Sequence, residues 1–385
     1  MSNSCHARIY VFSPSTDNYG APKFAYDLVN QLASLGTREV ILVLPTDRPS
    51  LIPETVAYIN QNVQIKYLSL PILRRYEFKS RDLLKTLLRL IKSFFLTFKY
   101  IRALEPDSVL HFVSITNLAI LCTGRFRRLN KTISIHEYLS PLEAHSLSLI
   151  TLKASFVTSC SEFIKDRFPN VLKKRIEVVY SGISIDEKIV RFRKESETIN
   201  ILCVGRINDW KGQKFLIQAF ADSIKTHDVP CHLTIVGSPL TGQEHFLKEL
   251  HQTARDLNLR DRISILDEDF NIGKHYSNSE IVIVPSIKPE PFGRTTVEAL
   301  HYGCAVIASS PGGASEILDE GKYGLLFNLN DKKGLSDAIT KLVTDDDLRE
   351  SFKTSGPERA AKYDSGVTIS KLTRELERLS NGSTN

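Results

Sequence analysis

Short apolar runs alternate along the chain with longer segments in which apolar residues recur every three or four positions. In the first half the short runs predict strands at 8–13, 39–44, 64–68, 108–113, 131–136 and 155–160, and the longer segments predict helices at 21–35 and 83–104. In the second half the strands are predicted at 199–204, 232–236, 262–266, 281–285, 305–308 and 324–327, and the helices at 213–223, 244–257, 295–302 and 332–344. Strands separated by helices of this length indicate βαβ units with parallel strands.

Because the pattern occurs twice, we predict an α/β protein with two Rossmann-like domains whose parallel sheets face each other across a cleft. A length of 385 residues suits two domains of middling size. We expect the first domain at 1–182, the second at 183–365, and a helix at 366–385 that could pack back on the first domain before a frayed tail. The junction is predicted at 181–197, a polar and basic stretch that precedes a new apolar strand.

The composition is close to the globular average, with 42% hydrophobic and 24% charged residues, so the chain is not predicted to be disordered. The charge is uneven. Residues 1–185 carry 24 Lys and Arg against 14 Asp and Glu, whereas residues 186–385 carry 26 against 30. A basic first half indicates an anionic partner for the first domain.

The cysteines are scattered singly and form no CxxC pair, so we expect buried thiols of a reduced cytoplasmic protein and no cysteine-bound metal. We identify no signal-peptide pattern at the amino end and no run of 18 uncharged apolar residues. Neither a signal peptide nor a membrane span is therefore predicted.

Two cations follow the first predicted strand of the second half. The segment INILCVGRINDWKG at 199–212 is typical of a buried strand, a turn at Gly205, and a loop that carries Arg206 and Lys211 into a helix. Loops at the carboxyl ends of parallel strands face the ligand crevice, and the start of a helix there favours anions. The two cations could hold both phosphates of a nucleoside diphosphate, and a solvated basic loop explains the segment equally well.

Two carboxylates follow a later strand. In IVIVPSIKPEPFGRTTVEAL at 281–300, Glu290 lies on a Pro-rich loop, and Glu298 lies in the helix that Gly293 precedes. Backbone N–H groups at 293–296 would point at a phosphate, and Glu298 could accept two ribose hydroxyls. A capping or ion-pairing role for Glu298 and simple exposure of Glu290 are the alternatives. PGGASE at 311–316 adds paired glycines, which suit either a close backbone approach or a plain turn.

In this order and spacing the motifs resemble those of the family-4 retaining glycosyltransferases, also described as glycosyl transferases group 1, which have the GT-B fold. The Glu-x7-Glu spacing is present at Glu290 and Glu298, the EPFG element is intact, and VGRINDWKG lies upstream. The resemblance is strong from about residue 199 to 328 and weaker over the first half. The donor-binding residues that it implies are Gly20, Gly205, Arg206, Lys211, Glu290, Pro291, Phe292, Gly293, Arg294, Thr295 and Glu298. The catalytic residues that it implies are Arg206, Lys211, Glu290 and His136.

Within this set, the resemblance implies that Arg206 and Lys211 neutralise the donor diphosphate. It assigns the ribose to Glu298 and the donor sugar to Glu290, while 292–295 would give backbone N–H contacts to phosphate and sugar.

The first half departs more from the family pattern. SPSTDNYGAPKFAYDLV resembles the family's glycine-rich loop and places Gly20 opposite the diphosphate, although Ala21 stands where a second glycine is usual. His136, in TISIHEY, resembles the family's histidine near the reacting sugar, with a structural role as the alternative. His111, in VLHFVS, is better interpreted as structural. In the second half, DED at 267–269 stands where the family commonly has a glycine, which leaves the nucleotide base open.

The resemblance implies a retaining, metal-independent hexosyltransferase-type enzyme without a cofactor. It would move a sugar from a nucleoside-diphosphate sugar to a glycan or lipid-linked glycan, in the synthesis of a bacterial cell-surface polysaccharide such as lipopolysaccharide O-antigen or capsule. A sugar-nucleotide epimerase of the same fold and an inactive glycan-binding scaffold are the alternatives. Nucleic-acid binding is not expected, because the basic helix at 79–104 lacks base-stacking aromatics on its polar face.

Residues 79–104 combine many cations with a wide apolar face. The cations are Lys79, Arg81, Lys85, Arg89, Lys92, Lys99 and Arg102, and the apolar residues are Leu83, Leu84, Leu87, Leu88, Leu90, Ile91, Phe94, Phe95, Phe98 and Ile101. A basic amphipathic helix suits the surface of an anionic membrane, and a core helix with a solvated basic back is the alternative. We therefore expect a cytoplasmic protein that is peripheral at the inner face of the cytoplasmic membrane.

Overall fold

The chain forms two compact units in its computed structural model, which describes residues 7–17, 19–73, 83–123, 129–185, 198–240, 242–269 and 271–381. The first unit comprises Met1–Ser181 and Ser365–Asn385, and the second comprises Gly182–Asp364. Most of the predicted junction at 181–197 lies outside the described residues, as do the predicted helix residues 79–82 and the tail at 382–385.

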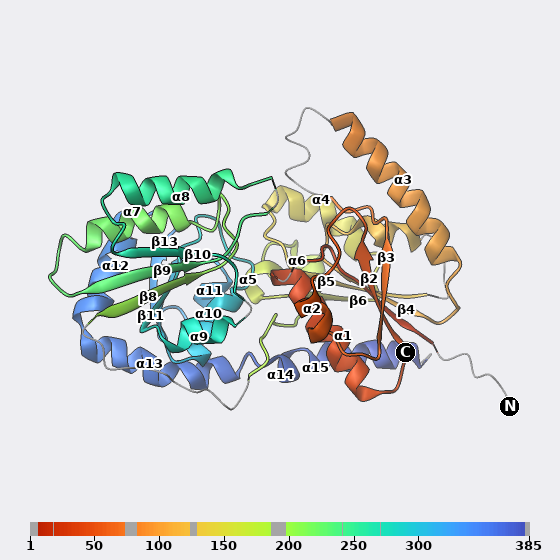
Figure 1. Cartoon of the computed structure of the whole chain (residues 1–385). Coiled ribbons are helices and arrows are strands. Elements are labelled where there is room, and N and C mark those ends of the chain that lie inside the picture. Colours follow the sequence, from red (N-terminus) through yellow and green to blue (C-terminus); the bar gives the residue numbers. More distant parts are fainter. Residues whose placement is uncertain are drawn as a thin grey trace. The chain divides into compact units, whose positions relative to one another are not determined.

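The first unit is built on a seven-stranded sheet in the order β3-β2-β1-β4-β5-β6-β7, in which every strand pairing is parallel (Figure 1). Its strands are β1 (Ile9–Phe12), β2 (Val40–Pro45), β3 (Val63–Leu68), β4 (Val109–Val113), β5 (Asn130–Ile135), β6 (Phe156–Ser159) and β7 (Ile176–Val178). The pattern of apolar runs did not predict β7, because this edge strand is short and its centre is the exposed Glu177.

The helices of the first unit include a segment from the end of the chain. They are α1 (Gly20–Leu35), α2 (Pro53–Tyr58), α3 (Leu83–Arg102), η2 (Leu118–Thr123), α4 (Pro141–Thr151), α5 (Glu162–Lys165), α6 (Asn170–Lys173), α14 (Ser365–Thr368) and α15 (Ser370–Ser380). Helix α15 contributes Leu372, Leu376 and Leu379 to the same buried cluster as Ile9, Phe24 and other core residues of β1 and α1. The carboxyl-terminal helix is therefore part of the first unit.

The second unit contains a six-stranded parallel sheet in the order β10-β9-β8-β11-β12-β13. Its strands are β8 (Ile199–Val204), β9 (Cys231–Val236), β10 (Ile263–Leu266), β11 (Ile281–Val284), β12 (Ala305–Ser310) and β13 (Leu325–Asn328). Its helices are α7 (Gln213–Ser223), α8 (His245–Asp256), α9 (Ile272–Ser277), α10 (Arg294–His301), α11 (Gly313–Ile317), α12 (Lys332–Thr344) and α13 (Asp346–Ala361).

The prediction of two Rossmann-like parallel sheets is confirmed. Every predicted strand is present with bounds that differ by at most two residues, and the same holds for the helices predicted at 21–35, 83–104, 213–223, 244–257, 295–302 and 332–344. The single helix predicted at 366–385 is divided in the structure between α14 and α15, and α15 ends at Ser380. The central strands are predictable because both of their faces are covered by helices, so they are nearly continuous apolar runs. All six residues of β2 and all four of β11 are buried.

The expectation of buried thiols is also confirmed for the cysteines that the structure describes, which are Cys122, Cys160, Cys203, Cys231 and Cys304. Cys5 lies outside the described residues. Among the helices of the described ranges, none has the length and apolar content that crossing a bilayer requires.

Candidate functional site

Two loops of the second unit start from neighbouring strands at the centre of its sheet. Strands β8 and β11 are hydrogen-bonded to each other, and the strand order runs outward from them in opposite directions. The loop at 205–212 follows β8, and the loop at 285–293 follows β11. In an open parallel sheet, ligands bind beyond the carboxyl ends of the two strands at which the order reverses. Both sequence motifs therefore lie where the topology favours a binding site.

The loop after β8 is held by polar side chains of its own segment. Asn208 Oδ1 accepts hydrogen bonds from the backbone N–H groups of Trp210 and Lys211, at 3.1 and 2.9 Å. The amide of the buried Gln213 donates to the backbone carbonyl of Arg206 at 3.0 Å. The backbone is thus fixed on both sides of the loop, and Lys211 extends from a defined position.

The two loops contact each other through their backbones. The N–H of Ile287 donates to the carbonyl of Trp210 at 2.9 Å. Gly212 has a φ of +76°, and a Cβ at this position would lie 1.9 Å from the carbonyl oxygen of Pro285. A side chain here requires one loop to move, and L-residues disfavour this backbone conformation. The glycine of the WKG sequence is therefore required by the packing of one loop on the other.

Lys211 and Glu290 form an ion pair that joins the two loops. The Lys211 Nζ lies 2.6 Å from Glu290 Oε1, and the same oxygen accepts a hydrogen bond from Ser286 Oγ at 2.5 Å. Glu290 is only 5% exposed, whereas 24% of the Lys211 side chain is exposed. The ammonium also lies over the ring of Trp210, 4.6 Å from its centroid. A buried carboxylate is stable only when it is paired and hydrogen-bonded, and these contacts supply both conditions.

Helix α10 begins beside this pair without a side-chain cap. Its N-cap is Gly293, with a φ of +107°. Pro291, Phe292, Arg294 and Thr295 surround this residue in the chain, so the sequence-predicted phosphate-binding segment is the start of the helix. The first turn of a helix carries partial positive charge and favours an anion.

Glu298, in the second turn of α10, is oriented by a buried tyrosine. Tyr276 Oη donates to Glu298 Oε2 at 2.8 Å. The Tyr276 ring is fully buried and stacks on Tyr302, with centroids 5.4 Å apart and planes at 15°. Burial, followed by the adjacent carboxylate, raises the pKa of Tyr276 well above its ordinary value. The phenol therefore stays neutral and keeps donating to Glu298.

The paired glycines at 312 and 313 pack against the loop that carries Glu290. The N–H of Gly313 donates to the carbonyl of Glu290 at 2.8 Å. A Cβ on Gly313 would lie 2.4 Å from the carbonyl oxygen of Phe292, and a Cβ on Gly312 would lie 3.0 Å from the nitrogen of Glu290. Of the two interpretations of PGGASE, the close backbone approach is the one observed.

The acidic segment at 267–269 has a local role in which Asp269 holds the start of α9. Its carboxylate accepts the N–H of Asn271 at 2.9 Å and pairs with Lys274 at 2.7 Å and His275 at 2.9 Å. These donors, Lys274 above all, hold the pKa of Asp269 below its ordinary value. Over the ranges that the structure describes, no three His, Cys, Asp or Glu side chains are grouped as metal ligands.

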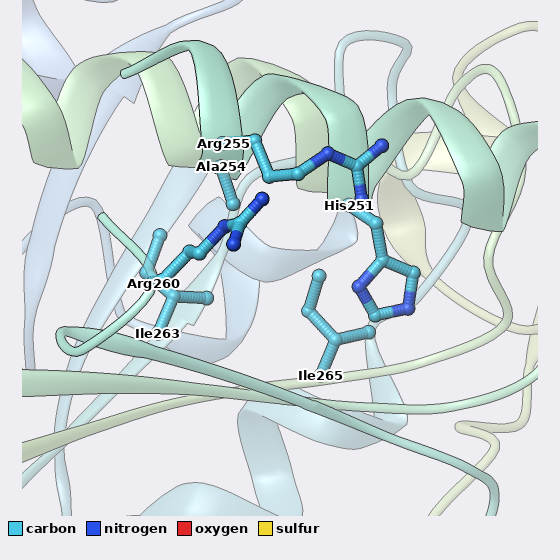
Figure 2. Close-up of a pocket in the computed structure, with 6 residues that line it drawn as sticks. All are labelled: His251, Ala254, Arg255, Arg260, Ile263 and Ile265. Atoms are coloured by element: carbon cyan, nitrogen blue, oxygen red, sulfur yellow. The ribbon is translucent and has the colours of Figure 1, made fainter. Parts of the chain in front are cut away.

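A pocket of about 360 Å³ lies elsewhere in the second unit, between α8 and β10 (Figure 2). It is lined by His251, Ala254, Arg255, Arg260, Ile263 and Ile265. Because β10 is an edge strand two positions away from β8, this pocket is separate from the loops at the centre of the sheet. None of the donor-binding or catalytic residues predicted from the sequence lines this pocket.

Comparison with known proteins identifies the same segment of the chain. Residues 184–359 match the family model described as "Glycosyl transferases group 1". These residues lie wholly within the second unit, Gly182–Asp364. The match includes both loops, the Lys211–Glu290 pair and the start of α10, so the second unit is the group 1 domain.

Curated relatives match parts of the chain. The "D-inositol 3-phosphate glycosyltransferase" of Corynebacterium urealyticum is 30% identical over 197 residues, which cover 50% of this chain and 43% of that protein. A Campylobacter jejuni protein is 28% identical, over 72% of this chain and 79% of its own length. Its name is "N-acetylgalactosamine-N,N'-diacetylbacillosaminyl-diphospho-undecaprenol 4-alpha-N-acetylgalactosaminyltransferase". The chain thus spans less than half of the first relative and about four fifths of the second.

Among solved structures, HepE of Anabaena in complex with UDP-glucose is similar over 97% of this chain and 99% of its own, with a TM-score of 0.75 and 20% identity. A likeness at this identity shows the fold. The group 1 domain and the first unit are the two Rossmann-like units of a GT-B fold.

The first unit holds the remaining predicted residues, Gly20 and His136. Gly20, with a φ of +50°, is the first residue of α1, and nothing lies within 4 Å of the position of a Cβ. His136 follows β5, with its Nδ1 3.0 Å from Ser181 Oγ and its ring 4.4 Å from the ring of Phe24. His136 therefore lies at the carboxyl end of β5, whereas Gly20 begins the helix that follows β1.

His111 has the surroundings of a structural histidine. It is fully buried, and its two ring nitrogens contact the hydroxyls of Thr132 and Ser134 at 2.8 and 3.2 Å. Burial lowers its pKa to about 3. The imidazole is therefore neutral in the folded protein at any ordinary pH.

Several residues that support the site were not predicted. Tyr276, Ser286 and Asn208 hold Glu298, Glu290 and the Lys211 loop, respectively. In the first unit, Glu137 accepts the N–H groups of Ile115 and His136 at 3.2 Å each, together with the hydroxyl of Ser114, and burial raises its pKa. Only Asn208 carried a sequence signal, because an Asn side chain often accepts a hydrogen bond from the backbone N–H two residues further along, in an Asx turn.

Proposed function

We propose that this chain is a retaining glycosyltransferase. It moves a sugar from a nucleoside-diphosphate sugar to a hydroxyl of a glycan or lipid-linked glycan acceptor. The match of the second unit to the group 1 family supports sugar transfer in general. The observation that carries the specific proposal is the Lys211–Glu290 pair at the centre of the second sheet, next to the uncapped start of α10.

The positive groups of this site suit a departing diphosphate. Arg206 and Lys211 extend from the loop after β8, and the start of α10 adds partial positive charge. In the transfer step, the bond between the sugar's anomeric carbon and the diphosphate oxygen breaks, and its electron pair leaves with the diphosphate. Fixed positive charge at that oxygen stabilises the transition state, and loss of one such contact typically costs about 3–4 kcal/mol of barrier height.

Glu290 is better suited to hold the donor sugar than to attack it. One of its oxygens already accepts from Lys211 and Ser286, so the carboxylate is fixed and its charge is compensated. A nucleophile needs an oxygen that is available to attack the anomeric carbon, whereas Glu290 Oε1 is already held by these two donors. We therefore assign retention to attack by the acceptor hydroxyl on the face from which the diphosphate leaves. Its proton passes to the leaving oxygen.

The same cations make the proposed reaction independent of a divalent metal, because they supply the charge that Mg²⁺ supplies in other transferases. Treatment with EDTA should leave the rate unchanged. Loss of transfer in EDTA that Mg²⁺ or Mn²⁺ restores would contradict this part of the proposal.

The acceptor and the location are further parts of the proposal. The name of the Campylobacter jejuni relative specifies a diphospho-undecaprenol acceptor, which supports a lipid-linked glycan here. The proposal includes a role in bacterial cell-surface polysaccharide synthesis, such as lipopolysaccharide O-antigen or capsule. It also includes a cytoplasmic location, peripheral at the inner face of the cytoplasmic membrane.

The test begins with the donor. A thermal-shift screen against UDP-, GDP-, ADP- and dTDP-sugars should identify one that raises Tm, and proton NMR of the product made from it should show a retained anomeric configuration. Lys211→Ala and Glu298→Ala should each abolish transfer, whereas Lys214→Ala, a change to an exposed lysine of α7, should not. Activity in the Lys211→Ala/Glu298→Ala double variant would refute the site. Isomerisation of the donor without acceptor would favour the epimerase, and binding without turnover would favour the inactive scaffold.

A further inference from the structure

Helix α3 in the first unit turns its apolar face toward solvent. Its buried residues are Thr86, Ser93, Thr97 and Ile101. Its exposed apolar side chains are Leu83, Leu84, Leu87, Leu88, Ile91, Phe95 and Leu96, each between 44% and 69% exposed. A helix on the surface of a soluble domain normally buries such a stripe and exposes its polar face. The core-helix alternative for this segment is therefore excluded.

Polar contacts fix the helix in this orientation. Ser93 Oγ lies 2.7 Å from Ser69 Oγ, and Thr97 Oγ1 donates to the carbonyl of Ser69 at 2.9 Å. Arg89 pairs with Asp47 at 3.1 Å and also donates to the carbonyl of Ile72 at 3.3 Å. A rotation of α3 that buried the leucines would break these contacts and place apolar side chains against the hydroxyl and the carbonyl of Ser69.

The exposed face is flanked by lysines. Lys85, Lys92 and Lys99 are exposed and recur every seven residues, which places them in a row along one side of α3. Lys92, Lys99 and Arg102 are all exposed along this part of α3. A broad apolar face beside a row of long cationic side chains is the pattern of a helix that lies in a membrane interface.

We propose that α3 binds the surface of an anionic lipid bilayer, lying parallel to it. Leu84, Leu88, Ile91 and Phe95 enter the boundary between headgroups and acyl chains, and the lysine row contacts lipid phosphates. This inference deepens the proposed membrane location and rests on the proposed function in one respect, because a lipid-linked acceptor would bring the chain to a bilayer. Figure 1 shows α3, in orange, on the outside of the first unit.

The charges favour lipid over a second copy of this chain. Two α3 helices packed through their apolar faces would bring their lysine rows close together, and like charges at such an interface are unfavourable. Residues 1–185 also have an excess of ten positive charges, with 24 Lys and Arg against 14 Asp and Glu. An anionic bilayer satisfies both the apolar face and this charge.

The test is flotation of the full chain with vesicles of phosphatidylcholine that contain 30% phosphatidylglycerol, compared with vesicles of phosphatidylcholine alone. We expect binding to the anionic vesicles that is at least tenfold weaker on the neutral ones and falls with salt. Leu88→Ser/Phe95→Ser and Lys92→Glu/Lys99→Glu should each weaken binding at least tenfold. The matched controls Leu149→Ser, an exposed leucine of α4, and Lys153→Glu, an exposed lysine that follows α4, should stay within twofold of the wild type.

Three results would overturn the proposal. They are no binding to anionic vesicles at low salt, unchanged binding by Leu88→Ser/Phe95→Ser, and self-association that this variant abolishes in a chain that does not float. Circular dichroism and the sugar-nucleotide thermal shift, measured on the same variants, establish that they are folded. A wild-type chain that floats but responds to no sugar nucleotide would contradict the proposed function and leave the membrane surface standing.

Discussion

The ion pair between Lys211 and Glu290 predicts a specific loss of stability when only one partner is removed. Lys211→Met leaves the 5% exposed carboxylate with the Ser286 hydroxyl but without its cation. Breaking a fully buried pair from one side typically costs about 3–5 kcal/mol. Because 24% of the Lys211 side chain is exposed, water partly replaces the ammonium, and we expect about 2–3 kcal/mol. Adding Glu290→Gln removes the unpaired charge and should restore about 1–2 kcal/mol of this loss.

Urea unfolding followed by fluorescence measures this loss in the correct unit, because the chain has a single tryptophan and that residue, Trp210, lies in the second unit. Far-UV circular dichroism follows both units, so disagreement between the two signals would reveal separate transitions. Lys214→Met is the matched control. Lys214 pairs with Glu249 at the surface, where both side chains are about half exposed, and the expected cost is below about 1 kcal/mol.

Unfolding of Lys211→Met at the same urea concentration as the control variant would refute a stabilising ion pair between Lys211 and Glu290. Simple additivity of the changes in unfolding free energy caused by Lys211→Met and Glu290→Gln would refute the pair as well, since independent changes mean that the two side chains do not interact. The result bears on activity measurements as well. Loss of transfer in a Lys211 variant must be compared at a temperature where the variant is folded.

Three further predictions concern the neighbours of the site and the first unit. Tyr276→Phe removes a hydrogen bond to the Glu298 carboxylate that is worth about 1.5–3 kcal/mol. Calorimetry should therefore show nucleoside-diphosphate affinity lowered by about tenfold or more and weaker discrimination against 2′-deoxyribose, whereas Tyr302→Phe, in the stacking partner of Tyr276, should change neither. Gly212→Ala should destabilise the second unit by more than about 2 kcal/mol in urea, whereas Gly242→Ala, which shares the positive φ but has nothing within 4 Å, should cost about 1 kcal/mol from backbone strain alone. The folded-state pKa of His111, about 3, lies below its ordinary value of 6.5. Its contribution to the stability of the folded state is therefore complete above pH 6.5 and is lost as the pH falls toward the folded-state pKa. Urea unfolding followed by circular dichroism should give a free energy of unfolding about 2 kcal/mol lower at pH 5 than at pH 6.5, and His111→Gln should remove that difference.

The fold could be predicted because its information is local. A strand such as β2, VILVLP, is buried over its whole length, and a helix such as α7 has an apolar face, so each is recognisable without its neighbours. Two features show where local pattern is not enough. Strand β7 is three residues long with an exposed centre, and the strand order at β8 and β11 follows from the general rules of parallel sheets rather than from any residue.

The site could be predicted only in part. The spacing of the motifs placed Lys211 and Glu290 on loops that follow strands, but their direct contact joins residues 79 positions apart. That contact depends on the backbone packing of Gly212 against Pro285, which periodicity does not encode. The partner of Glu298 was not predicted for the same reason, because Tyr276 is one of many buried aromatic residues until α9 is placed beside α10.

Helix α3 shows a different limit. Its amphipathic pattern was evident from the sequence, but amphipathicity does not tell which face a helix buries. The buried face of α3 is instead determined by small polar residues, because Ser93 and Thr97 make hydrogen bonds with Ser69 that leucine cannot make. A row of small hydroxyl side chains opposite the apolar stripe is thus the sequence signal of a helix that faces outward.

The glycines of the second unit indicate that the site is preorganised. Gly212, Gly312 and Gly313 each bring one loop backbone so close to another that a Cβ would lie within about 3 Å of it. The loop of Lys211, the loop of Glu290 and the start of α11 therefore cannot shift independently. If the proposed function holds, a donor diphosphate meets charges whose positions are already fixed, so little of its binding energy is used to order the protein. The same rigidity aims the Lys211 ammonium before the leaving group develops its charge, which is when fixed electrostatics are most effective.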